Sequence, residues 1–313
     1  MPNWIVHLAA GTALSSVIRS RSRILVLFLL GSILPDLSSI ANVLFLDRFT
    51  HLFKSWDFPI WYFQPFHTPF LAVFYSLALA LMVSGGWRRN FVNIYAGALT
   101  HFALDTFQRH IGFHHLMFYP FSMKDINVNL FFPDHWFFFV LGIVSVVLLL
   151  SLVLIDRKIF VSTGLKIEFR RSGWAALLVA AVICAPFLTK GLFYSSNYHW
   201  LQFFSGKDFE GRVVEIGNSR VVSLDPFRTV ELNRTLTLRI PAGIFPKGVK
   251  VGDWVSYRGI WRNKTVEVTL FHKNSRYFEK IYLSLAGALF ILWMVIVNFA
   301  GGGVHGLRQL RKK

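Results

Sequence analysis

The sequence predicts an α-helical polytopic membrane protein of about seven spans, with a small all-β barrel inserted before the last span. Two observations support this. Of the 313 residues 54% are hydrophobic, and 33 are Phe and 10 are Trp, which is too apolar and too aromatic for a soluble domain of this length. The apolar residues also gather in long runs, whereas residues 205–273 alternate between apolar and polar as strands do.

Most of the apolar runs approach the roughly 20 residues that cross a bilayer core. The expected spans lie near residues 4–18, 24–46, 58–84, 91–108, 135–155, 174–195 and 280–300. The first run is short enough to be partly interfacial. Because the opening MPNWIVHLAAG has no basic segment before its apolar residues and no convincing cleavage site, we expect it to be retained rather than removed as a signal peptide.

The net charge is +17, and the basic residues are distributed as the expected topology requires. Basic residues follow the first, third and fifth runs and close the chain: Arg19, Arg21, Arg23, Arg88, Arg89, Arg157, Lys158, Lys166, Arg170, Arg171, Arg308, Arg311, Lys312 and Lys313. The positive-inside rule then predicts a multi-pass protein of the bacterial inner membrane, with its N-terminus outside and its C-terminus in the cytoplasm. This topology explains the charge without a nucleic-acid partner. The single cysteine, Cys184, can form no internal disulfide.

Five ionisable side chains interrupt the apolar runs, and each costs roughly 2.5–3.5 kcal/mol in a membrane helix unless it has a partner. They are His7, Asp36, His67, His101 and Asp105. His101 and Asp105 are four residues apart and share a helix face. The expected topology brings all five to a similar depth, which favours a shared metal ion. Alone, each histidine could be a packed core residue, and Asp36 could cap a helix after Pro35.

The types of donor atom limit which metals are expected at such a site. Imidazole and carboxylate groups suit Zn²⁺, which we favour, with Mn²⁺ or Fe²⁺ as alternatives, and without a thiolate a soft-metal cage is not expected. The sequence therefore predicts a divalent metal cofactor.

Several motifs in residues 1–125 carry a resemblance. They are HLAAG at 7–11, GSILPD at 31–36, HTP at 67–69, THFALD at 100–105 and GFHHLMFYPFS at 112–122. In this order they resemble the LexA-binding, inner-membrane-associated metal-dependent hydrolase family. The resemblance implies metal-binding roles for His7, Asp36, His67, His101 and Asp105.

The chain departs from the family pattern at three places, one of which is Pro69, where the family usually has another residue type. Ser38 stands where a second aspartate is expected, and Tyr62 and Phe63 occupy the neighbourhood of a further histidine. A missing ligand could come from His51, His110, His114 or His115, of which we favour His114 or His115; for each, a solvated loop histidine is the alternative.

A metal site of this kind predicts hydrolysis. A divalent metal lowers the pKa of a water molecule, and Asp105 or Asp36 could accept its proton as the catalytic base. A site near the outer leaflet favours lipid or lipid-linked esters, or small phosphoesters, as substrates. A more distant likeness to zinc-dependent phospholipase C-like helical folds supports this by analogy. The alternative is a non-enzymatic scaffold or assembly factor with a structural metal site.

The strand-like segment predicts a separate extracytoplasmic domain. Strands are expected at 211–217, 219–224, 235–241, 253–261 and 264–271, which is typical of a small OB-like barrel. The expected division is a hydrolase core at 1–130, supporting helices at 131–200, the barrel at 201–278, and a last span with a basic tail at 279–313. The barrel could be a substrate lid, a structural cap or a docking module for a protein partner.

Overall fold

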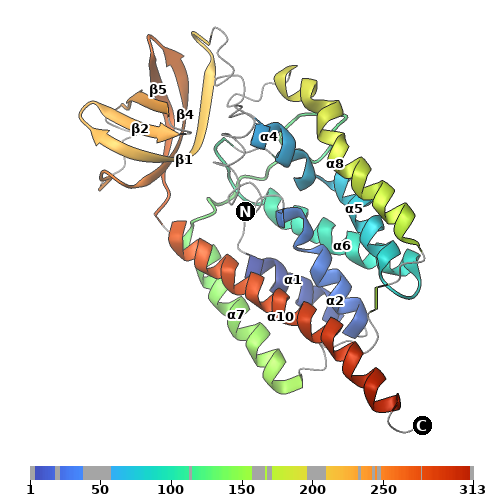
Figure 1. Ribbon diagram of the computed structural model, residues 1–313. Coiled ribbons are helices and arrows are strands. Elements are labelled where there is room, and N and C mark those ends of the chain that lie inside the picture. The colour runs from blue at the N-terminus through green and yellow to red at the C-terminus, as the bar shows by residue number, and fades with distance from the viewer. Residues whose placement is uncertain are drawn as a thin grey trace.

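The computed structural model comprises a helical body and a β-barrel that lies at one end of it (Figure 1). It describes residues 4–17, 22–37, 58–112, 115–156, 166–167, 171–195, 209–231, 234–241, 244, 248–275 and 277–310. Ser38, His51 and His114 lie outside the described residues, as does most of the basic segment after residue 156.

The helical body is built from two groups of helices. Its elements are α1 (Trp4–Val17), α2 (Ser22–Gly31), α4 (Phe58–Phe63), the 3₁₀ helix η1 (Gln64–His67), α5 (Pro69–Met82), α6 (Trp87–Thr106), α7 (Trp136–Asp156), α8 (Ser172–Ser195) and α10 (Tyr277–Leu310). Helices α1, α7 and α10 pack on one another, and α5 contacts both α6 and α8 (Figure 1). Contacts from α1 and α2 to α6 join the two groups.

The prediction of seven membrane spans is wrong. In the described part of the chain, two helices are long and apolar enough to cross a membrane, over Trp136–Ile155 in α7 and Ser172–Phe193 in α8. The pair Trp61–His67 and Pro69–Met82, bent by 73°, would at most add a third. Helices α1 and α2 have only 14 and 10 residues.

The error has a physical cause, because a buried core helix and a lipid-facing helix have similar compositions. In α1 and α2 the apolar side chains, such as Leu8, Leu27 and Leu29, are buried in the protein's own core. In α7 and α8, by contrast, only 22% and 17% of the apolar window is buried inside the molecule. Their apolar surface faces outward, as a bilayer requires.

The close approach of α2 to α6 depends on Gly97. A Cβ atom built there would lie 2.1 Å from the carbonyl oxygen of Phe28, which no side chain tolerates. Because Gly97 leaves this space free, the two helix backbones touch one turn below His101. Residues 32–33 form a turn after α2, and the chain is helical again at 34–37, which includes Asp36.

The predicted barrel is present in the structure. Five strands close in the order β1-β2-β3-β5-β4: β1 (Val213–Leu224), β2 (Phe227–Glu231), β3 (Arg234–Arg239), β4 (Trp254–Arg262) and β5 (Thr265–Lys273). The strands expected at 211–217 and 219–224 form one strand, β1, whose register shifts between Ile216 and Ser219. The second strand, β2, was missed because its sequence FRTVE is short and directly follows the turn at Asp225-Pro226.

Candidate metal centre

Four donor atoms from three separated segments gather around the Nε2 atoms of His67 and His101. The Nε2 atom of His67 is 2.9 Å from the Nε2 atom of His101 and 3.0 Å from Oδ2 of Asp105. His101 Nε2 is 3.1 Å from the same Oδ2. Asp36 Oδ1 lies 3.6 Å from His67 Nε2 and 3.7 Å from His101 Nε2. The structure therefore brings four of the five predicted ligands around one point.

These distances fit a metal coordination shell. With metal–ligand bonds of about 2.0–2.2 Å, donor atoms are separated by about 3.3–3.5 Å in a tetrahedral site and by slightly less in an octahedral one. The spacings at the centre, from 2.9 to 3.7 Å, bracket these values. Three overlapping groups can each place three ligand atoms within 4.8 Å: His7, His101 and Asp105; Asp36, His67 and His101; and His67, Asp105 and His115.

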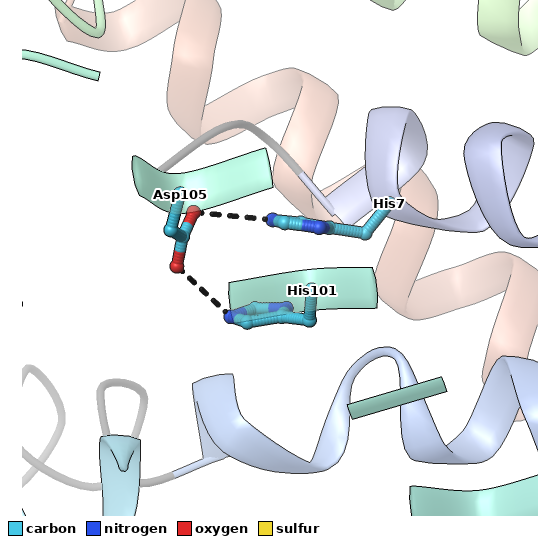
Figure 2. Close-up of side chains that lie close together, drawn as sticks. All are labelled: His7, His101 and Asp105. Atoms are coloured by element: carbon cyan, nitrogen blue, oxygen red, sulfur yellow. Dashed lines mark ion pairs between the residues drawn. The ribbon is translucent and has the colours of Figure 1, made fainter. Parts of the chain in front are cut away.

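His7 joins the centre from α1. Its Nε2 lies 3.5 Å from Oδ1 of Asp105, and its ring stacks on that of His101 with the centroids 3.9 Å apart (Figure 2). No described residue forms a hydrogen bond with either ring nitrogen of His7. His7, the fifth predicted ligand, thus lies beside Oδ1 of Asp105, whereas His67 and His101 lie beside Oδ2 of the same carboxylate.

The local structure orients each ligand. His101 and Asp105 lie one turn apart on α6, and the Nδ1–H of His101 donates to the carbonyl of Ser32 at 2.8 Å. This bond leaves Nε2 as the ligand atom, a common arrangement for metal-binding histidines. His67 ends η1, and Thr68 caps α5 by accepting from the amide of Leu71.

The side chains of the centre are almost completely buried, so any charge on them must be compensated. The exposed fractions of His7, His101 and Asp105 are 0%, that of Asp36 is 1%, and that of His67 is 6%. Buried charges are stable only when they are paired or coordinate a metal, because removal from water is expensive. Two carboxylates among three imidazoles satisfy this condition.

His115 is the sixth candidate, and it is also buried. Desolvation lowers the pKa of His115 to about 4, so the ring is neutral at pH 7 and has a lone pair to offer. Its Nε2 atom has no hydrogen-bond partner among residues that the structure describes. His110 contacts the His115 ring but belongs to none of the three groups.

Sequence reasoning missed the groups that hold the ligands in place. Gln108 is fully buried and donates from Nε2 to Oδ1 of Asp105 at 3.2 Å, and the carbonyl of Ser32 orients His101. The spacing could have indicated the contact between Gln108 and Asp105, because Gln108 follows Asp105 by three residues at the end of a helix.

Comparisons with known proteins add no assignment. No protein-family model matches this chain. No curated protein and no solved structure matches it either. The function is therefore inferred from the site itself.

Proposed function

We propose that this protein is a membrane-associated, metal-dependent hydrolase of ester or phosphoester bonds. The observation that supports it best is the convergence of ligand atoms from His67, His101, Asp105 and Asp36, with His7 beside them. The donor set contains nitrogen and oxygen but no sulfur, as in catalytic rather than cysteine-rich structural zinc sites.

A divalent cation held there would supply Lewis-acid polarisation of the scissile bond and lower the pKa of a water molecule. The two carboxylates have different roles. Asp105 contacts three histidines and Gln108, so it is committed to the ligand shell. Asp36 makes only the longer contacts, and its oxygens accept no hydrogen bond from a described residue. Asp36 is therefore the better general base.

The substrate class follows from the surroundings. Helices α7 and α8 are able to span a membrane, which would hold the centre at a lipid surface. We propose the bacterial inner membrane as this location and its outer leaflet as the side from which substrate enters. Lipid or lipid-linked esters and phosphoesters are then the expected substrates, and Zn²⁺ is the expected metal.

A structural metal site in a non-enzymatic scaffold is the second candidate function. The near-complete burial of all five ligand side chains favours it, because a structural site is closed whereas a catalytic site keeps one position open. The two candidates differ in whether a metal-loaded protein turns over substrate.

The test is elemental analysis of the purified full-length protein, together with hydrolysis of bis(p-nitrophenyl) phosphate and a p-nitrophenyl ester with added Zn²⁺ or Mn²⁺. We expect bound metal and hydrolysis in the wild type. Asp105→Asn should lose both. Asp36→Asn should keep most of its metal but lose roughly 10²–10⁴-fold in kcat.

Glu267→Gln is the matched control, because Glu267 lies on the barrel and, among residues the structure describes, pairs only with the exposed Arg239 and Arg262. It should leave both measurements unchanged. Metal-loaded protein that hydrolyses neither substrate would favour the scaffold, and protein that holds no metal would refute both candidates.

A further inference from the structure

Two short stretches of chain beside the centre, residues 106–109 and 128–134, pair with each other and are here called the strap. Its two halves are joined by backbone hydrogen bonds. The amide of Val128 donates to the carbonyl of Thr106 at 2.6 Å, and the amide of Arg109 donates to the carbonyl of Phe131 at 2.7 Å. The strap directly continues α6, which carries His101 and Asp105. The strap is therefore covalently continuous with the end of the ligand helix.

One end of the strap holds a metal ligand. The side chain of Gln108 donates to Oδ1 of Asp105, so this oxygen is fixed while Oδ2 faces His67 and His101. A carboxylate only accepts, which assigns the amide nitrogen of Gln108 to this contact. The residue is fully buried, and its orientation depends on the strap backbone.

The other end of the strap is held by the barrel. Asp134 accepts from Nε2 of His272 at 2.6 Å through Oδ1, and from the amide of Ser275 at 2.9 Å through Oδ2. The ring of His272 also stacks on Phe132, with centroids 3.7 Å apart and planes 7° from parallel. We call this set the clasp. It joins the strap to β5, the last strand of the barrel, and to the residues that follow it.

A second contact places the barrel close to the same region. A Cβ atom at Gly112 would lie 2.7 Å from the backbone nitrogen of Gly217, at the register shift of β1. Gly112 also has a φ of +80°, which side chains disfavour. The barrel therefore contacts this region of the chain at two places, at Gly112 and at the clasp.

We propose that the barrel is a positioning module for the metal centre, in which the clasp holds the strap and Gln108 in turn orients Asp105. This inference rests on the proposed metal binding. In it, Gln108 is a positioning residue, since it contacts a ligand rather than the metal. Residues that orient metal ligands are often worth about 10–100-fold in metal affinity.

The experiment is a titration of the full-length protein with Co²⁺, whose visible absorption reports both binding and coordination geometry. Gln108→Met keeps the side-chain length but cannot donate, and we expect it to raise the Kd by about 10–100-fold and alter the Co²⁺ spectrum. Asp134→Asn weakens the clasp and should raise the Kd by about threefold to tenfold, the effect of one hydrogen bond.

The double variant is the decisive measurement. If the clasp acts through Gln108, then Gln108→Met/Asp134→Asn should bind Co²⁺ as Gln108→Met does. In that background the hydrogen bond from Gln108 to Asp105 is already absent, so weakening the clasp can cause no further loss of affinity. Glu267→Gln, on the same strand β5 but away from the clasp, is the control and should bind as the wild type does.

Additive effects of the two changes, or an unchanged Kd in Asp134→Asn, would overturn the inference. If Asp134→Asn folds poorly, His272→Phe replaces it, because this variant keeps an aromatic ring to stack on Phe132 and removes only the hydrogen bond. A wild type that binds no Co²⁺ would refute the proposed function and this inference together. Normal binding by both the wild type and Gln108→Met would refute the inference alone.

Discussion

The Nε2 atoms of His67 and His101 lie 2.9 Å apart in the buried centre, although the residues are 34 positions apart in the chain. Because the Nδ1–H of His101 already donates to a backbone carbonyl, its Nε2 is a lone-pair acceptor when the ring is neutral. Two lone pairs facing each other repel unless a proton or a cation lies between them. The nearby carboxylate of Asp105 attracts either one, so a divalent cation would compete with a proton for this position.

The first prediction is that a divalent cation stabilises the fold. A ligand that binds only the folded state adds about 2.7 kcal/mol to the free energy of unfolding at one hundred times its Kd. Thermal unfolding of the protein with Zn²⁺ and with a chelator should therefore show a higher midpoint with Zn²⁺. His101→Asn should lose most of this difference, and equal midpoints in the wild type would contradict the prediction.

The second prediction concerns the contact between α2 and α6. Gly97→Ala forces a methyl group to within about 2 Å of the carbonyl of Phe28, so the helices must separate. Overpacking of this kind typically costs about 1–3 kcal/mol. Because His101 lies one turn further along α6 and is held by Ser32 at the end of α2, we expect Zn²⁺ affinity to fall together with stability. Both can be measured by denaturant unfolding and metal titration.

Gly191→Ala is the matched control. Gly191 lies within α8, and a Cβ atom there would have no neighbour within 4 Å. Alanine is favoured over glycine in a helix by roughly 0.5–1 kcal/mol, so this variant should be neutral or slightly more stable. A loss of stability as large as that of Gly97→Ala would show that helix packing is not the cause.

The candidate site was more predictable from the sequence than the membrane topology. Ionisable residues in apolar runs are costly anywhere in a protein core, so His7, Asp36 and Asp105 were identifiable whether their helices face lipid or protein. Apolar composition alone does not separate these two environments. For this reason the sequence predicts spans at 4–18 and 91–108, although the structure packs these helices against the protein's own core.

The groups that support the ligands were beyond the sequence for a different reason. The bond from His101 to Ser32 links positions 69 residues apart, and the clasp between Asp134 and His272 links positions 138 apart. Neither has a local spacing that marks it. In the barrel, alternation predicted strands correctly but could not show that β1 continues through the irregularity at Gly217.

The third prediction is a pH dependence of the clasp. Burial alone would raise the pKa of Asp134, but the hydrogen bond and charge of His272 and the amide of Ser275 outweigh it, so the pKa is lowered. Such a carboxylate stabilises the fold above its unfolded pKa of about 3.9, and the contribution is lost as the pH falls through the folded value. As the pH falls from about 5, the stability difference between wild type and Asp134→Asn should thus shrink, most steeply below about pH 4. A difference that grows on acidification would contradict this.

The fourth prediction uses the single cysteine to test whether α8 crosses a membrane. Cys184 is a free, exposed thiol near the middle of the apolar stretch Ser172–Phe193. If this stretch spans a bilayer, the thiol lies in hydrocarbon, out of reach of charged reagents. In membrane vesicles, a charged maleimide should leave Cys184 unlabelled, whereas after denaturation in detergent the same reagent should label it fully. Rapid labelling in intact vesicles would show that this face of α8 meets water.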